Sequence, residues 1–137
     1  MKNYTINLMT MDFTDSGQAN SSLCTLGSNG LCEMGQSSIS AAKSLHSHWG
    51  VPYSQIELTP MIGGNDSIDE TFTIADAATI SSFALSNGLG GIHFWSFERD
   101  TDCAPAKSDN DSSDTCNNYG KAGTLGYTNA FITDLKL

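Results

Sequence analysis

The sequence predicts an α/β fold whose strands run parallel and are joined by right-handed crossovers. Three strand-like segments each precede a helix-like segment along the 137 residues, and this alternation is typical of a parallel sheet covered by helices. Long polar loops follow the strands, whereas the returns from helix to strand are short. We therefore expect any functional site to lie at the carboxyl ends of the strands.

The first predicted strand spans residues 4–13, with the sequence YTINLMTMDF. Its side chains alternate, so that Met9 and Met11 lie on one face while Ile6 and Leu8 lie on the other. Both faces are largely apolar, which is typical of a strand covered on both sides.

A helix is predicted over about residues 36–48, after a polar loop. Apolar residues recur along one of its faces, and they are Ile39, Ala42, Leu45 and Trp49. Such a stripe packs against a sheet, so we expect Trp49 in the core. Gly50 is typical of the residue that ends a helix.

The second unit consists of a strand over residues 55–62 and a helix that begins after Thr73. Thr73 is a good N-cap, and Asp76 stands where a capping box needs an acidic partner. Asn87 and Gly88 predict the left-handed end of this helix.

The third unit consists of a strand over residues 89–97, a long acidic loop, and a helix over about residues 127–135. We expect His93 to face the helices and Arg99 to pair with a neighbouring carboxylate. No linker divides the chain, so residues 1–137 are expected to form a single unit.

The charge balance excludes two classes of partner. The formal net charge is −9, from 15 acidic and 6 basic residues. Binding to phosphates needs a basic patch, so we expect neither nucleic acid nor an anionic membrane surface as a partner. No apolar run approaches the roughly 20 residues that span a bilayer.

The four cysteines form two local pairs in sequence, Cys24 with Cys32 and Cys103 with Cys116. Three connectivities are open, and the local one has the lowest cost of loop closure. Disulfides would indicate secretion or the periplasm, with a signal peptide lost from a longer precursor. The alternative is four reduced thiols in a cytosolic protein.

Neither a metal nor a cofactor is expected. The cysteine spacings are not CxxC, and no histidine lies close to either pair, which argues against structural zinc. Residues 109–111, Asp-Asn-Asp, lack the glycine and terminal glutamate of a calcium loop, so a solvated loop is expected there. No glycine-rich phosphate loop is present.

Three phrases at the predicted strand ends resemble a known family. They are INLMTMDF at 6–13, LTPMIGGND at 58–66 and GLGGIHFWSFERD at 88–100. In this order they resemble the last three βα units of glycoside hydrolase family 18 chitinases of the bacterial-type branch, and EMGQSSISAAKSLH at 33–46 resembles their sixth helix. The resemblance implies the C-terminal portion of a TIM (β/α)8 barrel, about strands six to eight with their helices.

The resemblance also implies a reaction. Family members hydrolyse β-1,4-linked N-acetylglucosamine polymers such as chitin, by attack of the substrate's own acetamido group. A glutamate in a DxxDxDxE signature on strand four acts as general acid and base. That signature is absent from this sequence, so the chain is expected to be inactive without the N-terminal half of a barrel.

The resemblance assigns two residues to the sugar. Trp95 matches the strand-eight tryptophan that forms an apolar floor beneath the sugar, although a buried core tryptophan is the alternative. Asp12 matches a strand-six aspartate that contacts the sugar or its acetamido group, although it could merely begin a loop.

Further candidates line the same end of the strands. Met9 and Met11 would point into the barrel or simply fill its core; many relatives carry tyrosine in place of Met11, and methionine cannot donate its hydrogen bond. Met61, Asn65 and Asp66 would line the cleft or form a turn.

The sequence is also compatible with two other functions. The chain could be a non-catalytic module that binds chito-oligosaccharides or assembles with another copy of itself across its open sheet edge. It could also be a doubly wound α/β protein of unrelated function.

Overall fold

The computed structural model describes residues 3–15, 18–104 and 112–137. Three strands form a parallel sheet in the order β1-β2-β5, which confirms the predicted parallel arrangement. These strands are β1 (Ile6–Met9), β2 (Ile56–Thr59) and β5 (Gly91–Ile92). The helices are α1 (Met34–Trp49), α2 (Ile74–Asn87) and α3 (Gly126–Leu135).

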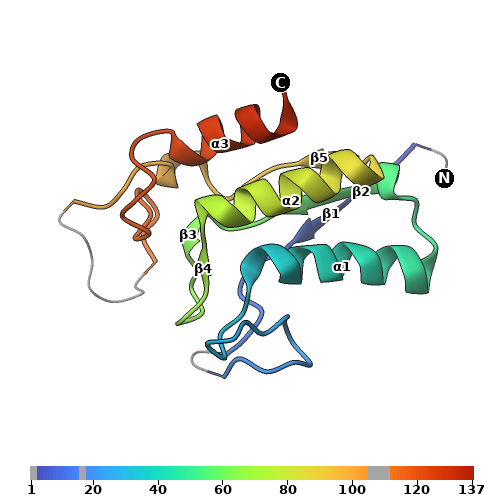
Figure 1. Cartoon of the computed structure of the whole chain (residues 1–137), viewed down its shortest axis with the longest axis horizontal. Helices are drawn as coiled ribbons and strands as arrows, with labels where there is room; N and C mark the ends of the chain where they lie inside the picture. The colour runs from blue at the N-terminus through green and yellow to red at the C-terminus, as the bar shows by residue number, and fades with distance from the viewer. Residues whose placement is uncertain (1–2, 16–17, 105–111) are drawn as a thin grey trace.

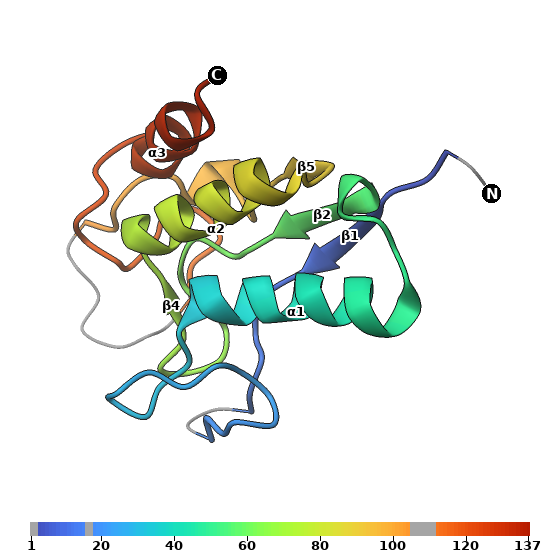
Figure 2. The ribbon, with the colours of Figure 1, turned by 45° about the vertical axis from the view of Figure 1, so that its right-hand side comes forward.

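All three helices lie side by side on one face of the sheet (Figure 1). Leu58 pairs in register with Leu8 and with Ile92, so these three side chains point the same way. Together with Ile80 of α2 and Phe131 of α3, they belong to the apolar core between sheet and helices. The opposite face of the sheet carries no described helix (Figure 2).

Helix α2 begins and ends where the sequence predicts. The Thr73 side chain accepts from the Asp76 amide, and the Asp76 carboxylate accepts from the Thr73 amide at 2.8 Å, which completes a capping box. The other Asp76 oxygen accepts from the Gly35 amide at 2.9 Å. The cap of α2 therefore also fixes the start of α1.

Both predicted local disulfides are present. Cys24 bonds to Cys32 and Cys103 bonds to Cys116. Each closes one of the long loops that follow a strand, and these loops gather at the carboxyl end of the sheet. Residues 109–111, where a solvated loop is expected, lie outside the described residues.

The strands are shorter than their sequence patterns predict. Regular β1 pairing ends at Met9, and Asp12 then adopts a left-handed conformation with φ 49°. The pattern missed a small antiparallel hairpin in the β2–α2 connection, formed by β3 (Gly63–Gly64) and β4 (Thr71–Phe72). Side-chain alternation continues through loops whose main chain has already turned, so it does not mark where pairing stops.

Two expected placements are wrong. Trp49 is 79% exposed rather than in the core, because it stands in the last turn of α1, beyond the main apolar contacts of that helix. His93 contacts Glu57 at 3.3 Å, and Glu57 shares the helix-free face of the sheet with Asn7. His93 therefore faces away from the helices.

The sheet has two outer strands, β1 and β5, and neither pairs on its outer side within the part of the chain that the structure describes. No described helix is long and apolar enough to cross a membrane.

Candidate functional site

The candidate site lies at the carboxyl ends of β1, β2 and β5, where the sequence predicted it. Asp12 follows β1, Met61 follows β2, and Trp95 follows β5. An isolated parallel bridge joins Met61 to Trp95, so the second and third of these segments lie directly beside each other.

Trp95 presents an accessible ring on a fixed main chain. Its amide donates to the Pro60 carbonyl at 2.8 Å, and its carbonyl accepts from the Ile62 amide at 2.9 Å. The residue is 52% exposed, and a cis peptide bond links it to Ser96. A large, accessible aromatic face suits packing against the C–H groups on one side of a saturated ring.

Asp12 is exposed, and hydrogen bonds hold it on both sides. Its amide donates to Asn65 Oδ1 at 3.3 Å, and its Oδ1 accepts from the Ser67 amide at 2.9 Å. Among the described residues, Oδ2 accepts no hydrogen bond. One carboxylate oxygen is thus engaged in structure while the other is available to a ligand.

The β2 candidates divide into buried and exposed residues. Asn65 is fully buried, and its side-chain nitrogen Nδ2 donates to the Met61 and Gly63 carbonyls at 3.0 and 3.1 Å. Met61 is 4% exposed. Asp66 is exposed and accepts a hydrogen bond from Ser112. Asn65 and Met61 therefore shape the turn, which favours the turn-forming interpretation for both.

The β1 methionines lie at the same end of the strand. Met9 is 58% exposed and Met11 is half-buried. Met9 shares the helix-free face with Asn7, whose side chain accepts from the Thr59 hydroxyl at 2.6 Å. This face is thus a mixture of exposed apolar side chains and paired polar ones.

Arg99 is a buried cation whose hydrogen-bond partners differ from the expected carboxylate. The expected carboxylate partner is absent among the described residues, and the Arg99 guanidinium instead donates to the carbonyls of Ile62 at 3.0 Å, Gly64 at 2.6 Å and Ser113. Burial lowers the pKa of Arg99, and the negative charge of Asp66 opposes this effect. Arg99 therefore ties the β2 turn to the long loop after β5.

Asp100 is a second residue whose role the sequence did not reveal. It is 2% exposed, and its carboxylate accepts from the Tyr127 and Thr128 amides at 2.9 and 2.8 Å. These amides belong to the first turn of α3, whose N-cap residue Leu125 provides no side-chain cap. Asp100 thus anchors α3 to the turn that follows Trp95.

The structural role of Glu70 was also not predicted, because the residue stands in a turn and no sequence motif surrounds it. The residue is 1% exposed, and its carboxylate accepts from the Phe13 and Thr14 amides at 3.0 and 2.9 Å. Burial raises the pKa of Glu70, and these hydrogen bonds oppose the shift.

The described residues hold no group of three or more histidine, cysteine, aspartate or glutamate side chains placed to bind a metal ion. Within the same ranges, His93 with Glu57 is the single contact between a basic and an acidic side chain, and it lies on the helix-free face of the sheet.

Solved structures with the same fold are chitinase domains from Pyrococcus furiosus. They are the catalytic domain of a hyperthermophilic chitinase and catalytic-site mutants of the active domain 2 of a chitinase, the mutants also solved in complex with chito-oligosaccharides. Each is 22% identical in sequence with a TM-score of 0.65, and the match covers 96% of this chain but 40% of the other.

This likeness establishes the fold: the chain is folded like part of a chitinase catalytic domain. It spans less than half the length of the structures it matches. No protein-family profile matches the sequence, and no curated protein matches it significantly.

Proposed function

We propose that this chain is the C-terminal, substrate-holding part of a chitinase-like catalytic barrel of glycoside hydrolase family 18, bacterial-type branch. Its strands β1, β2 and β5 would be strands six, seven and eight. The observation that carries the proposal is the accessible Trp95 ring at the carboxyl end of a sheet whose fold matches 96% of the chain to chitinase catalytic domains.

The substrate in this proposal is chitin or its β-1,4-linked N-acetylglucosamine oligomers. Trp95 would form the floor under the sugar, because the C–H edge of a pyranose packs well on an indole face. Asp12 would accept a hydrogen bond from the acetamido N–H or a sugar hydroxyl through its free Oδ2. Met9, Met11 and Asp66 would line the cleft, while Met61 and Asn65 hold its wall.

Hydrolysis in this proposal is substrate-assisted and retaining. The acetamido carbonyl attacks the anomeric carbon as a glutamate protonates the leaving oxygen, and the same glutamate then activates water. That glutamate belongs to the DxxDxDxE signature, which the chain does not contain. The chain would therefore hydrolyse chitin only when it is joined to an N-terminal barrel half that supplies this glutamate.

The two disulfides support an oxidising environment, and we propose a secreted or periplasmic protein on that ground. The net charge of −9 offers no support for a nucleic acid or an anionic membrane as a partner.

A test of this function is to incubate the purified chain with a soluble N-acetylglucosamine hexamer. Tryptophan fluorescence would follow binding, and chromatography would follow cleavage. We expect saturable binding with the hexamer left intact. Turnover at an ordinary chitinase rate would contradict the assignment of the acid to another segment, and an absence of binding would contradict the substrate class.

A second candidate is a non-catalytic sugar-binding module that assembles with a copy of itself. The unpaired outer sides of β1 and β5 favour it, because an exposed strand edge is a template for pairing with another chain. Light scattering would show a dimer or larger species, and a monomer at all concentrations would contradict this candidate.

A further inference from the structure

Asp12 adopts a main-chain conformation that is uncommon for residues other than glycine. Its φ of 49° lies in the left-handed region, where Cβ crowds the main chain; aspartate enters this region more readily than most residues, but still at a cost relative to glycine. The neighbouring structure must therefore hold the segment from Asp12 to Thr14 in place if the carboxylate is to keep one orientation.

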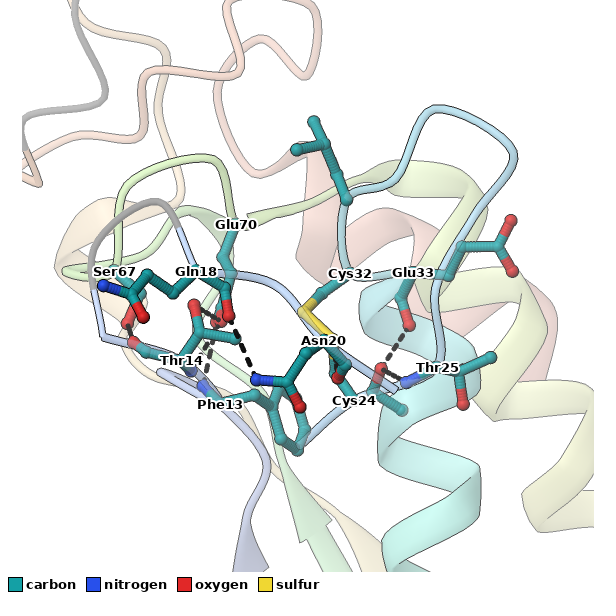
Figure 3. The surroundings of a disulfide bond; sticks show 12 residues. Phe13, Thr14, Gln18, Asn20, Cys24, Thr25, Cys32, Glu33, Ser67 and Glu70 are labelled. Atoms are coloured by element: carbon teal, nitrogen blue, oxygen red, sulfur yellow. Dashed lines mark hydrogen bonds between the residues drawn. A yellow bond between two sulfur atoms is a disulfide. The ribbon is translucent and has the colours of Figure 1, made fainter. Parts of the chain in front are cut away.

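Glu70 provides much of that support from a different segment of the chain. Its Oε2 accepts from the Phe13 amide at 3.0 Å. Its Oε1 accepts from both the Thr14 amide at 2.9 Å and the Thr14 hydroxyl at 3.0 Å. Figure 3 shows the Glu70 carboxylate directed at Phe13 and Thr14, the two residues that follow Asp12.

Glu70 is itself fixed by the turn that carries Asn65 and Ser67. The Glu70 carbonyl accepts from the Asn65 amide at 2.9 Å, and the Glu70 amide donates to the Ser67 carbonyl at 3.3 Å. The same Asn65 and Ser67 contact Asp12 directly. The side chain of Glu70 therefore completes a closed set of hydrogen bonds around Asp12.

The surroundings of Glu70 exclude most solvent. The residue is 1% exposed, and it borders a cavity of about 90 Å³ that is also lined by Thr14, Asp69 and Cys32 of the first disulfide. The low exposure of Glu70 places its carboxylate where hydrogen bonds to main-chain amides are stronger than in water.

We propose that Glu70 is the positioning residue that holds Asp12 in the orientation needed to contact the sugar. This inference rests on the proposed function, because it assigns Asp12 to the substrate. Glu70 does not touch the sugar; it acts through the main chain of Phe13 and Thr14.

A carboxylate is required at this position, because both of its oxygens accept hydrogen bonds from main-chain amides. Glutamine would present an NH2 group to one of the two amides and leave that pair of donors facing each other. Glu70→Gln is therefore nearly isosteric yet disrupts the arrangement. Asp69→Asn is the matched control, because Asp69 is exposed and its φ of 71° is tolerated by asparagine.

The first measurement is amide hydrogen exchange in the 137-residue chain, which needs no ligand. Glu70→Gln should lower the protection of the Phe13 and Thr14 amides, while Asp69→Asn leaves it unchanged. Unchanged protection in Glu70→Gln would overturn the inference whatever the chain binds. Thr14→Val removes one donor to the carboxylate and provides a milder variant if Glu70→Gln fails to fold.

The second measurement is calorimetric titration with an N-acetylglucosamine hexamer at a temperature where each variant is folded. Glu70→Gln and Asp12→Ala should each weaken binding about tenfold, which corresponds to one charge-assisted hydrogen bond. The double variant should bind no more weakly than Asp12→Ala alone, because Glu70 acts through Asp12. Additive losses would overturn the positioning role.

The outcomes separate the inference from the proposed function. If the parent chain does not bind the hexamer, the proposed function fails, and the role of Glu70 toward the sugar fails with it. If the parent and Glu70→Gln bind equally well, the positioning role alone is wrong and the substrate assignment stands.

Discussion

Asp100 offers a strong test of how the region around Trp95 is held together. The change is Asp100→Ala, which removes the carboxylate that accepts from the Tyr127 and Thr128 amides and from the Thr128 hydroxyl at 2.6 Å. Among the described residues, the first-turn amides of α3 have no other side-chain cap, since Leu125 supplies none.

The expected cost follows from the contacts that are lost. Removal of a helix cap costs about 0.5–2 kcal/mol, and a buried amide left without a partner adds about 1–3 kcal/mol. Because Asp100 is 2% exposed and its charge faces the helix N-terminus, we expect a total loss of about 1.5–5 kcal/mol in the free energy of unfolding. The melting temperature should fall by roughly 5–15 °C for a chain of this size.

Urea unfolding followed by far-ultraviolet circular dichroism would measure the change in the parent chain and both variants. The control is Glu98→Ala, which removes an exposed carboxylate from the same short 3-10 turn, Phe97–Arg99. We expect the control to stay within about 0.5 kcal/mol of the parent. Equal stability of Asp100→Ala and Glu98→Ala would refute the assignment of Asp100 as the cap of α3.

Three further predictions concern stability. Burial raises the pKa of Glu70, so the stability linked to its proton is complete below the pKa of an unfolded glutamate and is lost as pH rises through the folded pKa. Urea unfolding from about pH 4 to pH 8 should therefore show a free energy of unfolding that varies less with pH in Glu70→Gln than in the parent. Parallel pH dependences in the two chains would contradict this. Tyr127→Phe removes the hydroxyl that donates to the Phe72 carbonyl at 2.6 Å and should cost about 1–2 kcal/mol, so an unchanged urea midpoint counts against that bond. Thr73→Ala breaks the capping box with Asp76 and should cost about 1 kcal/mol; thermal melting at or above the parent temperature would show that the cap is dispensable.

Local chemistry in the sequence was sufficient to place the ends of α2. The N-cap Thr73 and the left-handed Gly88 fix the ends of α2 through contacts within a few residues, and such contacts are visible in a sequence. The disulfides were predictable for the same reason, because each closes a short loop.

The features that the sequence did not predict depend on contacts between residues far apart in the chain. Arg99 is buried because carbonyls of the β2 turn and of the loop after β5 converge on it, and no spacing in the sequence marks that meeting point. Trp49 continues an apolar stripe, yet it is 79% exposed, and Ala42 is the last residue of α1 that is fully buried. Periodicity predicts which side chains share a face, but it does not predict how far the opposing surface extends.

In the candidate site, too, some residues were predictable from the sequence and others were not. The positions of Asp12 and Trp95 at the strand ends followed from the order of strands and helices and from the family resemblance. Glu70 could not be found in this way, because its partners Phe13 and Thr14 are more than fifty residues away. Only the folded chain brings that carboxylate to the end of β1.

The central claim is that Trp95 forms the floor of a sugar-binding site, and one titration tests it directly. Calorimetry with an N-acetylglucosamine hexamer would compare the parent with Trp95→Ala and with Trp49→Ala, which removes an even more exposed tryptophan from α1. We predict that Trp49→Ala binds like the parent and that Trp95→Ala binds at least about tenfold more weakly, as expected for the loss of an aromatic sugar platform. Equal affinities for Trp95→Ala and the parent would contradict the claim.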